Sequence, residues 1–391
     1  MDSYSTTTLG IAFGNEFWVE KDISLPRVTL QYHFDSTNGM HGNLGESIQN
    51  VILPPLLPTI SQSGLVQQRI AKMAIKDSMS IACIVSLLGR RGVGAAHIPR
   101  PNFNWNDTKY LVAFGDSYTY VQGTAGYPNY SFIGSYLPEQ FGFSPDALLS
   151  NKIVQNFTGT AEGGPNWVEY LTGCGLVSGE TSPEDCHVQL WDFAFAGADV
   201  SLGYLAQHHD FTVPVVNQTQ QYLTWAEPVV GKKMDKAKAL VAFWIGINDI
   251  NDSSNFNNVS FSAFYDMLID TMFTESVHPM YMAGYKNFLF INLPPLDRTA
   301  ANVVSETPLP NKTMIGWWDD SLIKHSNTFA AKNKDAKAMV YDANRFLNRV
   351  LDNPAEFGIL NTTSYCLDFA DPDVQEHPDL HDCLAVLETI Q

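Results

Sequence analysis

The feature that most constrains the fold is an unbroken apolar run, Tyr110–Phe114, which stops abruptly at Gly115-Asp116-Ser117. A short apolar run without polar alternation indicates a strand that is buried on both faces, as in a parallel sheet. Gly115 permits a sharp turn after the strand. Ser117 is therefore expected just beyond the carboxyl end of the strand, where open α/β sheets bind their ligands.

Further strand-like runs alternate with helix-like segments, which predicts an α/β fold with a doubly wound parallel sheet. The segment after Ser117, Tyr118–Gly126, is expected to start a helix and then turn. In Phe261–Met272 the spacing predicts an amphipathic helix with Phe264, Met267, Leu268 and Met272 on one apolar stripe. The other predicted strands are 190–196, 236–245 with its approach, 287–291 and 338–342, and the other predicted helices are 167–171, 212–225, 317–331 and 343–351.

The charge balance excludes some classes of partner. A formal net charge of −18 argues against nucleic acid and anionic membranes, which favour basic surfaces. No apolar run reaches the ~20 residues of a membrane span, so stable membrane insertion is not expected. An acidic, aromatic-rich chain suits a secreted protein that handles neutral ligands such as sugars. We also expect the protein to be a monomer.

The closely spaced cysteine pairs and the glycosylation sequons all lie after the first hundred residues. Two closely spaced pairs, Cys174/Cys186 and Cys366/Cys383, could each close a local loop, whereas Cys83 is left over. Asn-x-Ser/Thr sequons begin only at Asn106, and their density fits a secreted glycoprotein. The others start at Asn129, Asn156, Asn217, Asn251, Asn258, Asn311 and Asn361.

The first part of the chain, residues 1–99, is interpreted as an extension without regular periodicity, ahead of one domain over 100–391. Within it, 79–96 resembles the apolar core of a secretory signal. The alternative is a buried helix of a genuine N-terminal domain. An internal signal does not normally work, so the extracellular location is an expectation from lineage.

Three groups could form an oxyanion hole around an attacking serine. Ser117 is the candidate nucleophile, and a serine hydroxyl needs both a base and oxyanion donors to react. The Ser117 and Gly197 backbone N–H groups and the Asn248 side-chain amide are the candidate donors. Taken singly, Ser117 could be a helix N-cap and Asn248 a turn residue. Together, each after a strand, they favour catalysis.

Five segments in order make the chain resemble the SGNH/GDSL hydrolases, and most closely a fungal secreted branch of acetyl esterases that act on carbohydrates. The segments are 114–120 (FGDSYTY), 163–171 (GGPNWVEYL), 193–198 (FAFAGA), 244–249 (WIGIND) and 292–298 (NLPPLDR). The resemblance implies a flavodoxin-like three-layer α/β/α sandwich and the roles given above for Ser117, Gly197 and Asn248. It also implies hydrolysis of short acyl esters without a metal or another cofactor.

The family's general base is the His of an Asp/Asn-x-x-His block after the last cysteine. Cys383 is followed only by LAVLETIQ, so the expectation is that the domain lacks its last segment and that this chain could be inactive as written. His377 is the candidate substitute base, and a solvated loop is the alternative for its segment. Two other functions stay open: a non-catalytic carbohydrate-binding protein, and a lipase for longer acyl chains.

Other polar and aromatic residues have simpler interpretations. Asp116 is expected to hydrogen-bond nearby backbone and fix the turn rather than to act as the catalytic acid. His187, His208 and His209 lack neighbouring ligands at metal-binding spacing, which favours exposed loop histidines and no metal site. Four tryptophans could stack on sugar rings, although their apolar surroundings favour the core for most: Trp167, Trp191, Trp225 and Trp244.

Overall fold

The computed structural model describes residues 103–133, 145–154, 165–177, 179–357, 359 and 362. The extension 1–99 with its signal-like segment, Cys83, the Cys366/Cys383 pair and His377 lie outside these residues. A parallel sheet in the order β2-β1-β3-β4-β5 is the centre of the fold. Its strands are β1 (Tyr110–Gly115), β2 (Gln189–Asp192), β3 (Ala239–Trp244), β4 (Asn287–Ile291) and β5 (Lys337–Tyr341).

This strand order is the flavodoxin-like one, in which ligands bind where β1 adjoins β3. The two strands pair in register from Tyr110 opposite Ala239 to Gly115 opposite Trp244. Gly115 is required at this point, because a Cβ there would lie 2.1 Å from the Trp244 carbonyl oxygen. The predicted doubly wound parallel sheet is confirmed.

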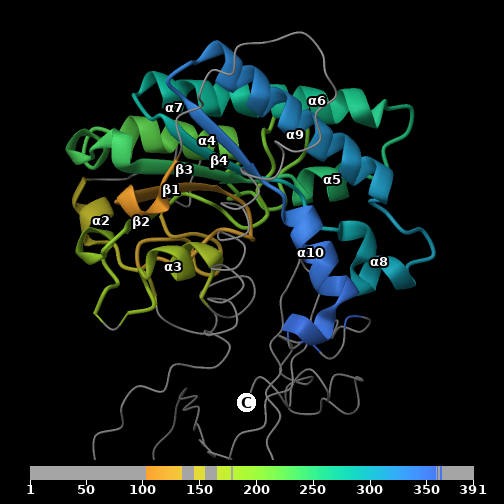
Figure 1. The fold of residues 1–391 in the computed structure, drawn as a ribbon, viewed down its shortest axis with the longest axis horizontal. Coiled ribbons are helices and arrows are strands. Elements are labelled where there is room, and N and C mark those ends of the chain that lie inside the picture. The colour runs from red at the N-terminus through yellow and green to blue at the C-terminus, as the bar shows by residue number, and fades with distance from the viewer. Residues whose placement is uncertain are drawn as a thin grey trace, which may run out of the picture.

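Helices cover both sides of the sheet, which gives the predicted three layers (Figure 1). In this view α4, α6, α7 and α9 lie on one side, and α3 and α10 lie on the other. The helices are α2 (Pro145–Ser150), α3 (Trp167–Thr172), α4 (Val215–Gln221), α5 (Ile247–Ser253), α6 (Phe261–Met272), α7 (His278–Met282), α8 (Ala300–Val304), α9 (Lys312–Lys332) and α10 (Ala343–Asp352). A π-helical turn continues α4 over Tyr222–Ala226 and α6 over Phe273–Val277.

The core is built from the strands of the sheet and from the helices on both of its sides. Leu111, Val112, Ala113 and Phe114 are fully buried, as expected of a strand covered on both faces. The ring of Phe114 stacks on Phe243 of β3 with centroids 5.1 Å apart. None of the described helices is both long enough and apolar enough to span a membrane.

Two local predictions are wrong. Tyr118–Gly126 forms turns and isolated bridges instead of starting a helix. Its backbone N–H groups find distant partners there: Ala125 donates to Asn151 Oδ1 at 2.8 Å. Tertiary hydrogen bonds thus replace the intrahelical ones. Met267 was expected on the apolar stripe of α6, but it is 40% exposed.

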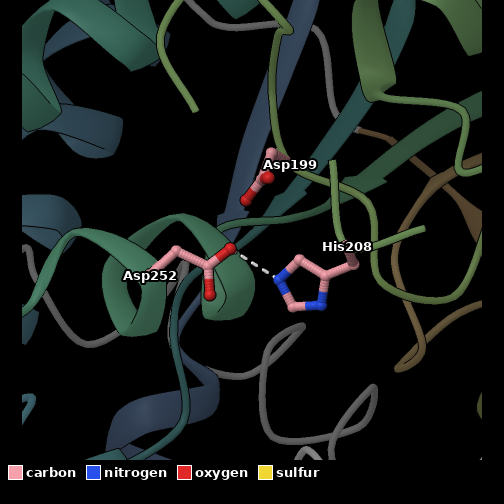
Figure 2. A group of neighbouring side chains, drawn as sticks. All are labelled: Asp199, His208 and Asp252. Carbon is pink, nitrogen blue, oxygen red and sulfur yellow. Dashed lines mark hydrogen bonds and ion pairs between the residues drawn. The ribbon is translucent and has the colours of Figure 1, made fainter. Parts of the chain in front are cut away.

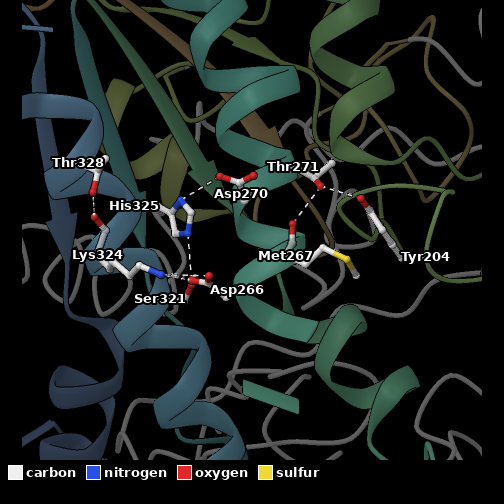
Figure 3. A network of polar contacts seen from close by, with 9 residues as sticks. All are labelled: Tyr204, Asp266, Met267, Asp270, Thr271, Ser321, Lys324, His325 and Thr328. Atoms are coloured by element: carbon white, nitrogen blue, oxygen red, sulfur yellow. Dashed lines mark hydrogen bonds and ion pairs between the residues drawn. The ribbon is translucent and has the colours of Figure 1, made fainter. Parts of the chain in front are cut away.

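A polar network joins α6 to α9 on the outer side of the sheet (Figure 3). The Asp266 carboxylate accepts hydrogen bonds from Lys324 at 2.8 Å and from Ser321 at 2.7 Å, and His325 Nε2 lies 3.0 Å away. These contacts, the one to Lys324 first, lower the pKa of Asp266 to about 2. The network also includes Tyr204, whose hydroxyl lies 3.0 Å from Thr271 Oγ1 and holds the 201–211 loop against α6.

The expected disulfide between Cys174 and Cys186 is present, with Cα atoms 5.3 Å apart. It closes the loop that leads from α3 to β2. Of the four tryptophans, Trp191 is fully buried, Trp225 is 37% exposed, and Trp167 and Trp244 are half-buried.

Candidate active site

The three predicted donors stand out because each is partly exposed within a buried stretch. Within 111–123 every residue is buried except Ser117, which is partly exposed. Within 190–200 the same is true of Gly197. In 239–250 the partly exposed positions are Trp244 and Asn248. These segments follow β1, β2 and β3, which are neighbours in the sheet. The fold therefore brings all three residues to the same edge.

The turn that carries Ser117 is held by its own aspartate. Asp116 is fully buried, and its Oδ1 accepts the backbone N–H of Tyr118 at 2.9 Å. The expected role of Asp116 in fixing the turn is confirmed. Burial raises the pKa of Asp116 to about 8, and the Coulombic repulsion of Asp249 adds to the rise.

Gln218 of α4 hydrogen-bonds the backbone directly before the same turn. Its Oε1 accepts the Gly115 N–H at 3.0 Å, and its Nε2 donates to the Gly115 carbonyl at 2.8 Å. Nε2 also donates to the Val213 carbonyl at 2.8 Å. The side chain is fully buried. One amide thus fixes both backbone groups of the residue that precedes Asp116-Ser117.

Helix α5 fastens the segment that contains Gly197. Asn248 Nδ2 donates to the Ala198 carbonyl at 2.8 Å, and Asp249 Oδ1 accepts the Val200 N–H at 3.0 Å. Gly197 itself has φ +78°, which suits glycine. Gly197 and the Asn248 amide are therefore adjacent.

Two more of the five segments that match the family contain Asn166 and Asn292, and both residues contact this edge of the sheet. Asn166 Nδ2 donates to the Tyr120 carbonyl at 3.0 Å, and the Trp167 ring lies edge-on to Trp244 at 6.2 Å. At the next strand, Trp244 Nε1 donates to the Asn292 carbonyl at 3.1 Å. These contacts help to hold the backbone that follows β1, β3 and β4 in place.

His208 is an exposed loop histidine, as expected, and its ring has a carboxylate partner. Its Nε2 lies 2.6 Å from Asp252 Oδ2, and its side chain is 26% exposed. The hydrogen bond to Asp252 raises the pKa of His208. A Cβ on Gly197 would lie 3.2 Å from the His208 Cβ, so this histidine packs on the Gly197 backbone. Asp252 follows Asn248 by one turn of α5.

Carboxyl groups gather around this edge and affect one another. Burial raises the pKa of Asp199 to about 9, with repulsion from Asp249, Asp252 and Asp116 as further causes. Burial likewise raises the pKa of Asp249 to about 7. A buried carboxyl group that loses its hydration favours its neutral form, so burial opposes the ionisation of these carboxyl groups.

A comparison with known families gives one match, and it covers most of the chain. The model described as GDSL-like Lipase/Acylhydrolase matches residues 111–378. The chain belongs to the GDSL-like lipase/acylhydrolase family. By lineage this GDSL protein is a carboxylic ester hydrolase, and its parallel sheet with helices on both sides agrees with the fold that the resemblance implied.

Among known proteins, this GDSL hydrolase is similar to two fungal acetylesterases. The acetylesterase of Thermothelomyces thermophilus is 27% identical over 271 residues, which cover 66% of this chain and 78% of the relative. That of Hypocrea jecorina is 24% identical over 204 residues, covering 50% of this chain and 49% of the relative. The resemblance to the fungal acetyl esterase branch is thereby confirmed.

Sequence reasoning missed Gln218 and the partners of His208. Gln218 lies in a predicted helix with other glutamines, Gln220 and Gln221, and nothing local marks it as buried. Asp252 lies far from His208 along the chain, so spacing could not join them. The contact of Asp249 with the Val200 N–H had one indication in the sequence. Asp249 directly follows Asn248 in the polar cluster after a predicted strand.

Proposed function

We propose that this GDSL hydrolase removes short acyl groups, acetyl above all, from carbohydrate esters, with Ser117 as the nucleophile. The observation that carries the proposal is the partly exposed trio Ser117, Gly197 and Asn248 at the ends of adjacent strands. This is the arrangement that acyl transfer needs, because the nucleophile and the oxyanion donors must face one reacting carbonyl.

The proposed reaction has two steps. Ser117 Oγ attacks the acyl carbonyl carbon while a base takes its proton, and the oxyanion accepts the N–H groups of Ser117 and Gly197. Asn248 Nδ2 has two hydrogens, so the contact with Ala198 leaves one for the oxyanion. Collapse releases the sugar alcohol, which takes the proton from the base, and water then hydrolyses the acyl-serine by the reverse proton transfers.

The proposed base is His377. It lies within residues 111–378, which the family model matches, whereas His381 lies beyond them. This supports His377 as the better candidate of the two. A positioned base typically contributes a factor of roughly 10²–10⁴ to the rate, so its loss is easily measured.

An aromatic group beside Gly197 supports a carbohydrate substrate. The Phe211 ring stacks on Tyr127 at 4.0 Å and on His209 at 5.0 Å, and Tyr130 lies edge-on to Phe211 at 4.9 Å. Tyr130 also accepts the Ala196 N–H through its carbonyl at 2.9 Å, directly before Gly197. These rings are partly exposed or exposed, and the two tyrosines among them combine apolar contact with hydrogen bonding. The name acetylesterase of both relatives agrees with acetyl as the acyl group that is removed.

Secretion and glycosylation belong to the same proposal. The sequon asparagines Asn106, Asn129, Asn258 and Asn311 are exposed, as glycan attachment requires. The disulfide between Cys174 and Cys186 fits an oxidising compartment.

The test is hydrolysis by the full chain of a chromogenic acetate and of an acetylated oligosaccharide. We expect turnover to fall at least ~10³-fold in Ser117→Ala. It should fall roughly 10²–10³-fold in Asn248→Ala and at least ~10²-fold in His377→Ala. The matched controls are Ser262→Ala, at an exposed position of α6, and His381→Ala, both of which should hydrolyse like the wild type.

Contrary outcomes would separate the parts of the proposal. Unchanged turnover in Ser117→Ala would exclude the serine mechanism. A folded wild type with no turnover would instead favour the carbohydrate-binding alternative. Faster hydrolysis of octanoyl than of acetyl esters would favour a lipase and contradict the proposed substrate class.

A further inference from the structure

Three side chains that the proposed mechanism does not use converge beside Gly197. Asp199 follows β2, His208 lies on the 201–211 loop, and Asp252 lies on α5 (Figure 2). Their potential ligand atoms, one from each side chain, all lie within 4.8 Å of one another. An imidazole nitrogen and two carboxylate oxygens are a donor set that suits Zn²⁺.

Asp199 provides a second, independent indication of a ligand. Its side chain is only 4% exposed, and among the described residues its Oδ1 has no hydrogen-bond partner. Figure 2 shows this carboxylate pointing toward the gap between His208 and Asp252. A buried polar atom without a partner costs free energy, and a cation in that gap would remove the cost.

The spacing and the charges agree with one bound ion. Ligands about 2.0–2.2 Å from a tetrahedral Zn²⁺ lie roughly 3.3 Å from each other. His208 Nε2 and Asp252 Oδ2, now 2.6 Å apart, would have to separate slightly. Asp116 and Asp249 lie close enough to Asp199 to disfavour its negative charge, and a divalent cation bound to Asp199 would offset this repulsion.

The segments that carry the three side chains are held independently of any ion. Tyr204 ties the 201–211 loop to Thr271 of α6 with a 3.0 Å contact. On the other side, Val215 donates its N–H to the Asp199 carbonyl at 3.0 Å. Because the ligands are partly preorganised, a cation would not have to assemble the site from separate flexible segments.

We propose that Asp199, His208 and Asp252 bind a zinc-type divalent cation next to Gly197. The cation links the segment after β2, the 201–211 loop and α5. Three protein ligands leave a fourth position open for water, as in zinc sites with an exchangeable ligand. This inference does not depend on Ser117 chemistry.

The experiment is equilibrium dialysis of chelator-treated full chain against ZnCl₂, with isothermal titration calorimetry for affinity. We expect one tight Zn²⁺ per chain. In Asp199→Asn and in His208→Ala the affinity should fall at least tenfold. The matched control is His209→Ala, the neighbouring histidine outside the cluster, which should bind Zn²⁺ like the wild type. Co²⁺ should report the nitrogen ligand through its visible absorption, and the absorption should change in His208→Ala.

Several results would overturn the site. They are the absence of Zn²⁺ binding by the wild type, equal affinity in all variants, and tight Ca²⁺ binding without Zn²⁺ binding. The first would leave His208 and Asp252 as an ion pair only. Circular dichroism of each variant excludes loss of folding as the cause of lost binding, and His208→Gln provides a milder second variant. Ser117→Ala should keep its Zn²⁺, which separates this site from the proposed function.

Discussion

At the scale of single residues, the position of the candidate nucleophile depends on Gln218, a residue outside the candidate site. Its amide bonds both backbone groups of Gly115 and also the Val213 carbonyl. Glutamine can do this because its side chain carries one acceptor and two donors. The position of Ser117 therefore depends on a side chain from α4.

Replacing Gln218 with leucine is expected to destabilise the protein and to lower catalytic rate. The Gly115 N–H and the Val213 carbonyl would lose the Gln218 amide, whereas the Gly115 carbonyl would keep the Phe195 N–H at 3.1 Å. Each buried group that is left unsatisfied costs about 1–3 kcal/mol. Because the turn would loosen, kcat should fall more than KM changes. Urea unfolding and acetate hydrolysis measure the two effects. Gln220→Leu, at an exposed position of the same helix, is the control, and equal effects in both variants would contradict the role of Gln218.

At the scale of elements, α3 depends on a capping box. Asn166 accepts the Trp167 N–H, and Glu169 Oε2 accepts the Asn166 N–H at 2.7 Å. Glu169 is 4% exposed, and burial raises its pKa from 4.5 to about 8. Between these values the folded chain holds a proton that the unfolded chain has lost. The contribution of Glu169 to stability is therefore fully present below about pH 4.5 and falls as the pH rises toward 8.

The variant Glu169→Gln is expected to keep the cap, since its amide oxygen still accepts the Asn166 N–H, but to lose this pH dependence. Relative to the wild type, its free energy of unfolding should be higher by about 1 kcal/mol or more at pH 8 and similar near pH 4.5. Urea unfolding across pH measures the difference. Asp146→Asn, at an exposed acid of α2, should show no such gain. A Glu169→Gln variant that is weaker at pH 8 would contradict the raised pKa.

Strands and long helices could be predicted from the sequence because their signals are local. The apolar run at Tyr110–Phe114 and the stripe of Phe261–Met272 contain enough information to identify a buried strand and an amphipathic helix. Tyr118–Gly126 could not be predicted well, because hydrogen bonds to distant groups decide its conformation. β2 ends at Asp192, earlier than the predicted strand 190–196, and the Asp192 side chain accepts the Ala194 N–H at 2.8 Å. The candidate site follows the same division: Ser117 and Asn248 follow recognisable strands, whereas Gln218 and Asp252 reach the edge only through the fold.

At the scale of the whole molecule, the net charge of −18 opposes self-association because copies repel one another. We expect the deglycosylated chain to be a monomer from low to moderate salt concentration. Light scattering after size exclusion should then give the mass of one chain, 43.4 kDa, at each salt concentration. A mass of two chains that persists in high salt would contradict this expectation.

The strand order has a consequence for synthesis on the ribosome. β1 is the first strand of the sheet to be made, but it lies inside the sheet between β2 and β3. Its backbone edge toward β3 stays unpaired, between apolar side chains, until residues 239–244 have left the exit tunnel, and parallel pairings of this kind form slowly. During that interval the nascent chain presents an aggregation-prone strand. Ser117 can meet Gly197 and Asn248 only afterwards, so the candidate site is assembled only when β2 and β3 have paired with β1.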